Sequence, residues 1–149
     1  MSKSKNNIVE ALSEVLADSY LLTLKIQNFH WNVTGPNFKS LHELFGDLYE
    51  ELSEAVDEIA ERIRALDSFS PGSFKEFSAI TNIKEATKSD VSAVEMLKQL
   101  IKDHEIILAT LKTALAVAQA DSDEATADIL IRRIEAHEKN KWMLKSSLS

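Results

Sequence analysis

The feature that most constrains the fold is a long helical pattern that follows a break in the chain. Gly35 and Pro36 interrupt regular structure, because proline lacks a backbone N–H and glycine tolerates positive φ. From Phe38 onward, apolar residues recur every three or four positions, which is typical of one face of an α-helix. These positions are Leu41, Leu44, Phe45, Leu48, Leu52, Val56, Ile59, Ile63 and Leu66. At about 100° per residue they all lie within roughly 60° of Leu41. The pattern predicts one helix from Phe38 to near Asp67.

Two carboxylates lie on the opposite face of this predicted helix. Asp57 falls near 160° and Glu61 near 200°, so they are neighbours that point away from the chain's own core. His42 falls near 100°, at the edge of the same outer face. His30 precedes the break and lies on the apolar stripe of the preceding helix, so it also fits a buried core histidine. Acidic residues on an outer helix face are usually just solvated. The residues alone therefore leave a structural and a metal-binding interpretation open.

Distance along the helix limits how such a site could form. His42 and Asp57 are 15 residues apart in the sequence, which is roughly 22 Å at about 1.5 Å per residue. Bonds from a metal to histidine or carboxylate are about 2 Å long, so one chain cannot place both residues on one ion. A shared site requires two chains. In an isologous twofold contact, His30 and His42 of one subunit would meet Asp57 and Glu61 of the other.

The rest of the chain predicts an all-α protein of one domain, 1–149, with four long amphipathic helices in an antiparallel four-helix bundle. Only three glycines and two prolines occur in 149 residues. After a short polar tail at 1–7, a first helix is expected from Ile8 to Val33. A third is expected from about Ser89 to Ala120, and a last one after 121–124. A short helix at 73–80, with Ser73 and Glu76 as a capping box, is expected between the second and third.

Other residues receive simpler structural interpretations. His104 lies in a charged patch and is expected at the surface, whereas His137 and Trp142 are expected to pack in the core or at an interface. Asp121 and Glu124 resemble an acidic capping box for the last helix. Trp31 leaves the apolar stripe and is expected to pack at an interface.

Composition narrows the functional classes. There is no cysteine, so any metal would be held by histidine and carboxylate, which suits iron, zinc or manganese. No run of about 18 apolar residues and no signal-type apolar segment occurs, so we expect a cytoplasmic protein without a membrane span. The net charge of −7, from 17 basic and 24 acidic residues, disfavours nonspecific DNA binding. The tail offers only Lys3 and Lys5, although many copies in an assembly would add avidity.

A resemblance to a known family rests on several motifs: the segment from His30 to Phe38 (HWNVTGPNF), then Leu41-His42-Glu43, the segment from Asp57 to Ile63 (DEIAERI), and His137-Glu138-Lys139 with Trp142-Met143-Leu144. Together they resemble the DNA-binding proteins from starved cells, the Dps family of ferritin-like miniferritins. The likeness covers nearly the whole chain. The short helix in the middle connection is also a hallmark of that family.

The resemblance implies a hollow homododecamer that oxidises Fe(II) to Fe(III), usually with hydrogen peroxide, and stores the iron mineral, which protects DNA from oxidative damage. Its ferroxidase centres lie at twofold interfaces, with ligands that correspond here to His30, His42, Asp57 and Glu61. Trp31 would lie beside the centre as a sink for oxidising equivalents. Acidic residues near the start of the last helix would line iron pores; the candidates here are Asp121, Asp123, Glu124 and Asp128, which also fit ordinary helix capping.

One position departs from the family pattern. The family usually has Asp or Glu four residues after the second histidine, and this sequence has Gly46 there. The iron position formed by His30, Asp57 and Glu61 is intact, whereas the second position near His42 lacks that carboxylate.

Two alternative functions stay open. One is a DNA-binding nucleoid protein of bacterial or archaeal type with weak ferroxidase activity. The other is a structural cage that binds zinc or another divalent ion.

Overall fold

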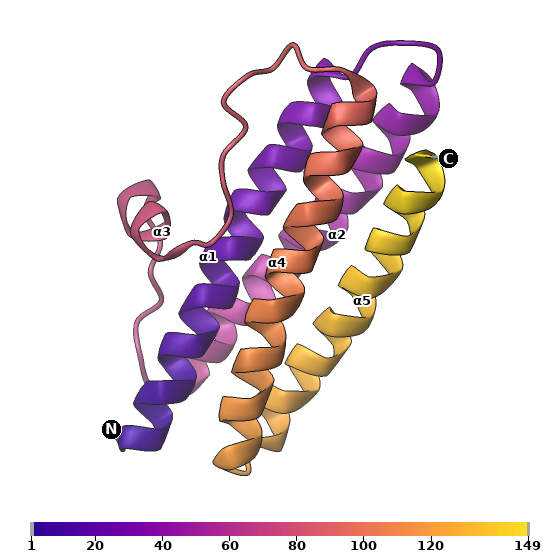
Figure 1. Ribbon diagram of the computed structural model, residues 1–149. Coiled ribbons are helices and arrows are strands. Elements are labelled where there is room, and N and C mark those ends of the chain that lie inside the picture. Colours follow the sequence, from indigo (N-terminus) through magenta and orange to yellow (C-terminus); the bar gives the residue numbers. More distant parts are fainter. Residues whose placement is uncertain (1, 149) are drawn as a thin grey trace.

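Four long helices and one short one make up the chain (Figure 1). In the computed structural model, which describes residues 2–148, they are α1 (Lys3–Asn32), α2 (Phe38–Ala65), α3 (Phe74–Ile80), α4 (Ala93–Ala120) and α5 (Glu124–Leu148). No strand occurs among these residues, so the all-α prediction is confirmed. None of the described helices combines the length and apolar character needed to cross a bilayer.

The four long helices form an antiparallel bundle with one long connection. A tight turn with Gly35 at φ 113° joins α1 to α2, as the sequence predicted. Another tight turn joins α4 to α5. The segment between α2 and α4 instead returns along the length of the bundle, carrying α3 outside α1, so α2 and α4 run in the same direction (Figure 1). The bundle of ferritin-like folds likewise has one long crossover.

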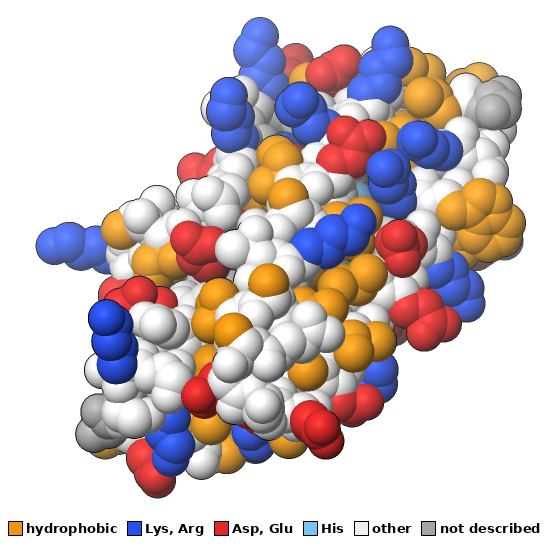
Figure 2. Space-filling view, turned by 60° about the horizontal axis from the view of Figure 1, so that its bottom comes forward, with side chains coloured by type: hydrophobic (Ala, Val, Ile, Leu, Met, Phe, Trp, Pro, Cys, Tyr) orange, Lys and Arg blue, Asp and Glu red, His pale blue; other side chains and the backbone are white. Residues whose placement is uncertain are grey.

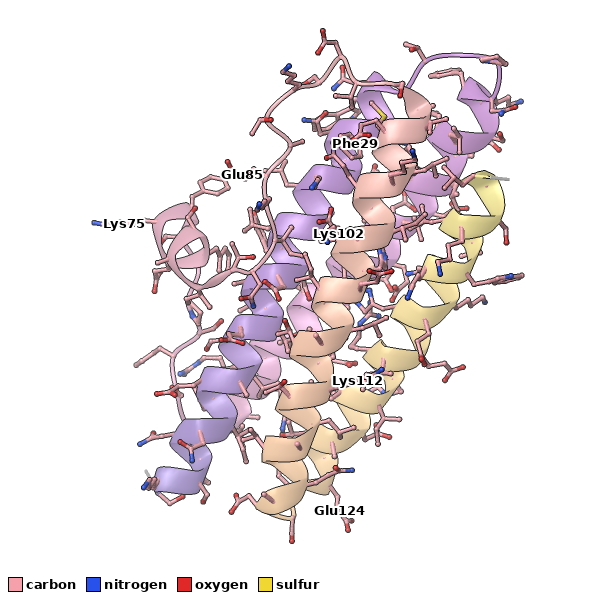
Figure 3. All side chains as sticks on the ribbon, in the orientation of Figure 1. Phe29, Lys75, Glu85, Lys102, Lys112 and Glu124 are labelled. Carbon is pink, nitrogen blue, oxygen red and sulfur yellow. The ribbon has the colours of Figure 1, made fainter. Side chains whose placement is uncertain are left out.

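The core is formed by the apolar faces that the spacing predicted. In α2, Leu44 and Val56 are half-buried, and every other predicted apolar position is buried. Phe29 and Phe45 are fully buried and are the largest such side chains, with Phe29 lying between α1 and α4 (Figure 3). Burying a side chain of this size contributes on the order of 1.5–3 kcal/mol. Packing of these faces therefore holds the bundle together.

A buried carboxylate fastens the long connection to the bundle. Asp18 in α1 has no exposed surface and accepts hydrogen bonds from the Thr81 hydroxyl (2.7 Å), the Asn82 backbone N–H (2.7 Å) and the Thr110 hydroxyl (2.7 Å). The Asn82 side-chain amide donates a fourth bond at 3.3 Å. A buried carboxyl group requires such partners. Asp18 thereby joins α1, the connection and α4.

Helix capping corrects several predicted boundaries. The expected polar tail at 1–7 is helical from Lys3, because the Ser2 side chain accepts a hydrogen bond from the Lys5 N–H; Met1 lies outside the described residues. The third long helix begins at Ala93 rather than near Ser89, because Ser92 caps it in the same way. The Ser73 cap of the short helix is confirmed.

The capping box predicted from Asp121 and Glu124 is wrong. Asp121 instead ends α4, and Glu124 is the first residue of α5. The carboxylate of Asp123 accepts hydrogen bonds from the Thr126 N–H (3.1 Å) and hydroxyl (2.6 Å), so it is the residue that caps α5. A capping side chain must lie just before the first helical turn, and the turn between α4 and α5 places Asp123 there.

His104 is not the surface residue that its charged neighbours suggested. It is 1% exposed and lies in the bundle interior opposite His137, which is equally buried, with 5.3 Å between the two ring centroids. Lys102 and Glu105 are exposed, but Asp103, directly before His104, is also buried, where it pairs with Lys25 of α1 at 2.9 Å. His137 is a packing residue, as expected. Trp142 is 62% exposed in the single chain.

Candidate metal centre

Two histidines face each other across the turn between α1 and α2. His30 lies in the last turn of α1 and His42 near the start of α2. Their rings are stacked with 3.8 Å between centroids and 12° between planes. Both side chains are half-buried, so His30 is not the fully enclosed core histidine that its position on the apolar stripe allowed.

Reciprocal hydrogen bonds determine which nitrogen of each ring carries the proton. His30 Nδ1 lies 2.6 Å from the carbonyl oxygen of His42, and His42 Nδ1 lies 2.6 Å from the carbonyl oxygen of His30. A carbonyl can only accept, so each Nδ1 must donate its hydrogen. In the neutral rings the lone pair is then on Nε2. Histidine ligands commonly have this arrangement, with one nitrogen on the metal and the other held by a carbonyl or carboxylate.

Aromatic neighbours hold the pair on both sides. The Phe38 ring stacks on His42 at 5.2 Å between centroids, and the edge of Tyr49 meets His30 at 5.3 Å. Trp31, the next residue after His30, is 61% exposed, as a residue reserved for an interface would be in a single chain. The two rings are therefore held in a fixed arrangement, which makes the pair a candidate half-site with two imidazole nitrogens.

Asp57 and Glu61 form a second candidate half-site farther along α2. Both side chains are exposed on the outer face, one turn apart, as the helical spacing predicted. Helix α2 continues unbroken from Phe38 to Ala65, so the 15 residues from His42 to Asp57 span roughly 22 Å. Among the described residues, no three His, Asp or Glu side chains come close enough to hold one metal ion within the chain.

The acidic residues at the start of α5 are not equivalent. Asp123 pairs with Arg62 at 3.0 Å; burial alone would raise the pKa of Asp123, but hydrogen bonds from Thr126 and the charge of Arg62 lower it. Asp128 pairs with Arg132 at 3.1 Å on the surface. Asp121 and Glu124 are exposed, and Glu124 projects from the end of the bundle (Figure 3). Asp123, Glu124 and Asp128 line a surface hollow there.

Comparisons with known proteins place the chain in a family. Residues 9–149 match the model of the ferritin-like domain. The DNA protection during starvation protein 2 of Bacillus anthracis is 39% identical over 142 residues, which is 95% of this chain and 97% of that protein. The crystal structure of a Dps protein from Bacillus brevis superposes with a TM-score of 0.96 and 36% identity, covering 100% of this chain and 99% of that one. The chain belongs to the Dps family of ferritin-like proteins.

The Dps fold extends to more distant relatives. A Dps protein from Vibrio cholerae, described as a member of a broad superfamily of ferritin-like diiron-carboxylate proteins, has a TM-score of 0.93 and 29% identity, covering 98% of this chain and 91% of that one. The resemblance inferred from the histidine and carboxylate motifs is thus confirmed at the level of family and fold. The assignment of metal binding to His30, His42, Asp57 and Glu61 in this Dps protein is a prediction.

Proposed function

We propose that this Dps protein oxidises Fe(II) to Fe(III) and stores the product inside a closed homododecamer, with ferroxidase centres built between subunits. The observation that carries this proposal is the separation of two complementary pairs of side chains: His30 of α1 with His42 of α2, and Asp57 with Glu61 farther along α2. One end presents two imidazoles and the other presents two carboxylates, at a distance that no single ion can bridge.

An isologous contact would complete both half-sites at once. If two copies of α2 pair antiparallel around a twofold axis, the histidines of each subunit face the carboxylates of its partner, and two equivalent centres form. Each centre would contain two imidazole nitrogens and the carboxylates of Asp57 and Glu61. Carboxylates are hard oxygen donors that favour Fe(III) over Fe(II), so they draw the bound iron towards oxidation.

An uncovered apolar surface beside the carboxylates supports a subunit contact there. A hollow between α1, α2 and α3 is lined by Tyr20, Val56, Ala60, Phe74 and Phe77. Phe74 is 70% exposed in the single chain, and Val56 and Ala60 flank Asp57 and Glu61 in the sequence. Exposed apolar side chains grouped in a hollow mark interaction surfaces. A partner seated there would bring its own α2 close to the carboxylates.

The expected reaction consumes Fe(II) as a substrate. Hydrogen peroxide accepts two electrons and two protons to give water, so each molecule oxidises two Fe(II) ions. Pairwise use of peroxide avoids the one-electron reaction that releases hydroxyl radical. Storage and protection of DNA from oxidative damage would thus follow from the same centre, in agreement with the name of the Bacillus anthracis relative.

Mixed assemblies test the two-chain geometry. One variant carries His30→Ala and His42→Ala, and a second carries Asp57→Ala and Glu61→Ala. Each variant alone should oxidise Fe(II) little faster than buffer, because every centre lacks one half. Co-assembled cages should regain activity, since a twofold dimer of unlike variants has one centre with all four ligands and one with none.

Two controls make the result decisive. Light scattering must give the same cage size for wild type, both variants and the mixture, and mass spectrometry must detect both chains in the same cage. Verified mixed cages that stay inactive would exclude the intersubunit centre. A monomer at micromolar concentration would remove its basis altogether.

Two rival functions make different predictions. Nucleoid binding needs a positive surface, but Lys3 and Lys5 belong to α1 rather than to a free tail, and Lys5 lies 4.0 Å from Asp67. Acidic and basic side chains are also intermixed on the face that carries the α4–α5 turn (Figure 2). A gel shift at low and moderate salt tests this rival. A zinc-binding cage would use the same donors, but peroxide added after anaerobic Fe(II) loading would oxidise the iron no faster than in buffer without protein.

A further inference from the structure

Gly46 lies in the interior of α2, and its backbone conformation does not explain why glycine is found there. Glycine destabilises a helix interior relative to alanine, so its presence there calls for an explanation. Gly35 is the only glycine of the described chain with a positive φ; Gly46 has ordinary helical geometry and is buried. Its role must therefore lie in the space that a side chain would fill.

That space is occupied by the ring of His30 from the same chain. A Cβ atom added at position 46 would lie 3.0 Å from His30 Cε1 and 3.2 Å from His30 Nδ1. Optimal contacts between carbon atoms are about 3.5–4.0 Å, so the imidazole would have to move by several tenths of an ångström. At Gly72, by contrast, an added Cβ would meet no atom within 4 Å.

The His30 ring cannot move alone. It donates to the His42 carbonyl, stacks on the His42 ring, and lies beneath the edge of Tyr49. The return hydrogen bond from His42 Nδ1 reaches the carbonyl of His30 itself. A shift of the His30 imidazole would therefore loosen the stacking and the hydrogen bond that orient both candidate ligands.

We propose that Gly46 is a positioning residue of the metal centre: its missing Cβ forms the seat for the His30 imidazole, and this seat holds both histidines with Nδ1 on a carbonyl and Nε2 free for a metal ion. The proposal rests on the proposed function, because it assigns Gly46 a role at the same centre. In this chain, a Cβ at position 46 would enter the space that the His30 ring fills.

Binding of cobalt(II) alone, followed by its visible absorbance without air or peroxide, tests the seat apart from oxidation. Gly46→Ala should bind cobalt roughly tenfold or more weakly than wild type, the usual effect of disturbing the partners that orient a histidine ligand. Gly72→Ala is the matched control for an added methyl group, since that group meets no atom of its own chain within 4 Å. Gly72 lines the hollow proposed as a subunit contact, so its affinity is compared in assembled protein, where it should equal that of wild type. Light scattering confirms that each protein is assembled.

A double-mutant cycle, measured by thermal unfolding, supplies a second readout that involves no metal. In a His30→Ala background no ring occupies the seat, so Gly46→Ala should raise Tm by roughly 2–4 °C through helix propensity. With His30 present, the same substitution should give no such gain, because the methyl group must displace the ring. An equal rise of Tm in both backgrounds would overturn the proposal that Gly46 makes room for the His30 ring.

The outcomes separate the two proposals. If wild type binds cobalt and Gly46→Ala binds it equally well, Gly46 has no positioning role while the proposed centre stands. If wild type binds no cobalt, the proposed function fails, and the positioning role fails with it. If Gly46→Ala does not assemble, the double variant with His30→Ala decides: recovered assembly identifies the displaced ring as the cause, and continued failure assigns Gly46 to subunit contact instead.

Discussion

Acidification should destabilise this protein through a histidine that plays no part in the proposed centre. His104 is 1% exposed, and its Nδ1 donates to the Leu100 carbonyl at 2.7 Å. Burial lowers the pKa of His104 from 6.5 to about 4; the positive charges of Arg133 and Lys141 also lower it, while the Leu100 hydrogen bond and Glu51 act in the opposite direction. The folded state therefore holds His104 neutral.

His137, which lies opposite His104, is also held neutral in the folded state. His137 Nε2 lies 3.1 Å from a guanidinium nitrogen of Arg133, which can only donate, so the ring must accept there. Burial first, and then the charges of His104 and Arg133, hold the pKa of His137 well below its usual range. The Arg133 guanidinium is itself paired with Glu51 of α2. A proton on either histidine would add a charge to an interior that already contains a cation.

The sign and size of the effect follow from the His104 pKa. Below pH 6.5 the unfolded chain binds a proton at His104 that the folded chain does not, so stability is complete at neutral pH and falls as pH drops towards 4. From pH 7 to pH 5 this histidine alone should cost about 2 kcal/mol, and by pH 4 about 3 kcal/mol.

Urea unfolding followed by circular dichroism at pH 7 and pH 5 measures this loss. His104→Leu removes the titrating group, so the difference in unfolding free energy between the two pH values should be about 2 kcal/mol smaller than in wild type. Any repacking of the core is the same at both pH values and cancels in that difference. Subunit concentration must be held constant, because assembly is linked to stability. Equal losses in wild type and His104→Leu would refute the neutral, buried assignment.

Three further perturbations test other parts of the structure. Asp18→Ala leaves the buried Thr110 hydroxyl and the partly buried donors of Thr81 and Asn82 without an acceptor. It should lower the unfolding free energy by about 3–5 kcal/mol in urea titrations, whereas exposed Glu14→Ala on the same helix should change it by less than about 0.5 kcal/mol. If Glu124 and Asp128 guide cations, Glu124→Gln with Asp128→Asn should slow uptake at low Fe(II) in stopped-flow assays, and less so as salt screens the field. Asp123→Asn should instead act on stability through its pair with Arg62. An uptake rate unaltered by the double substitution would leave these residues a surface role only.

The sequence by itself determined the helices and the geometry along them. Apolar spacing identified the buried face of α2, and the Gly35–Pro36 break set the turn before it. The separation of His42 from Asp57 also followed directly, because the rise per residue of an α-helix is nearly constant. These properties depend on residues a few positions apart, so local periodicity is enough to predict them.

The tertiary structure decided what covers each face. The charged neighbours of His104 suggested the surface, but the side chain points between α4 and α5, where only packing of the whole bundle excludes water. Asp123 rather than Asp121 caps α5, because the turn and Arg62 of α2 select it. The seat at Gly46 depends on how closely α1 approaches α2. In each case the deciding neighbour lies on another helix or is placed by the fold of a turn, and helical periodicity carries no information about either.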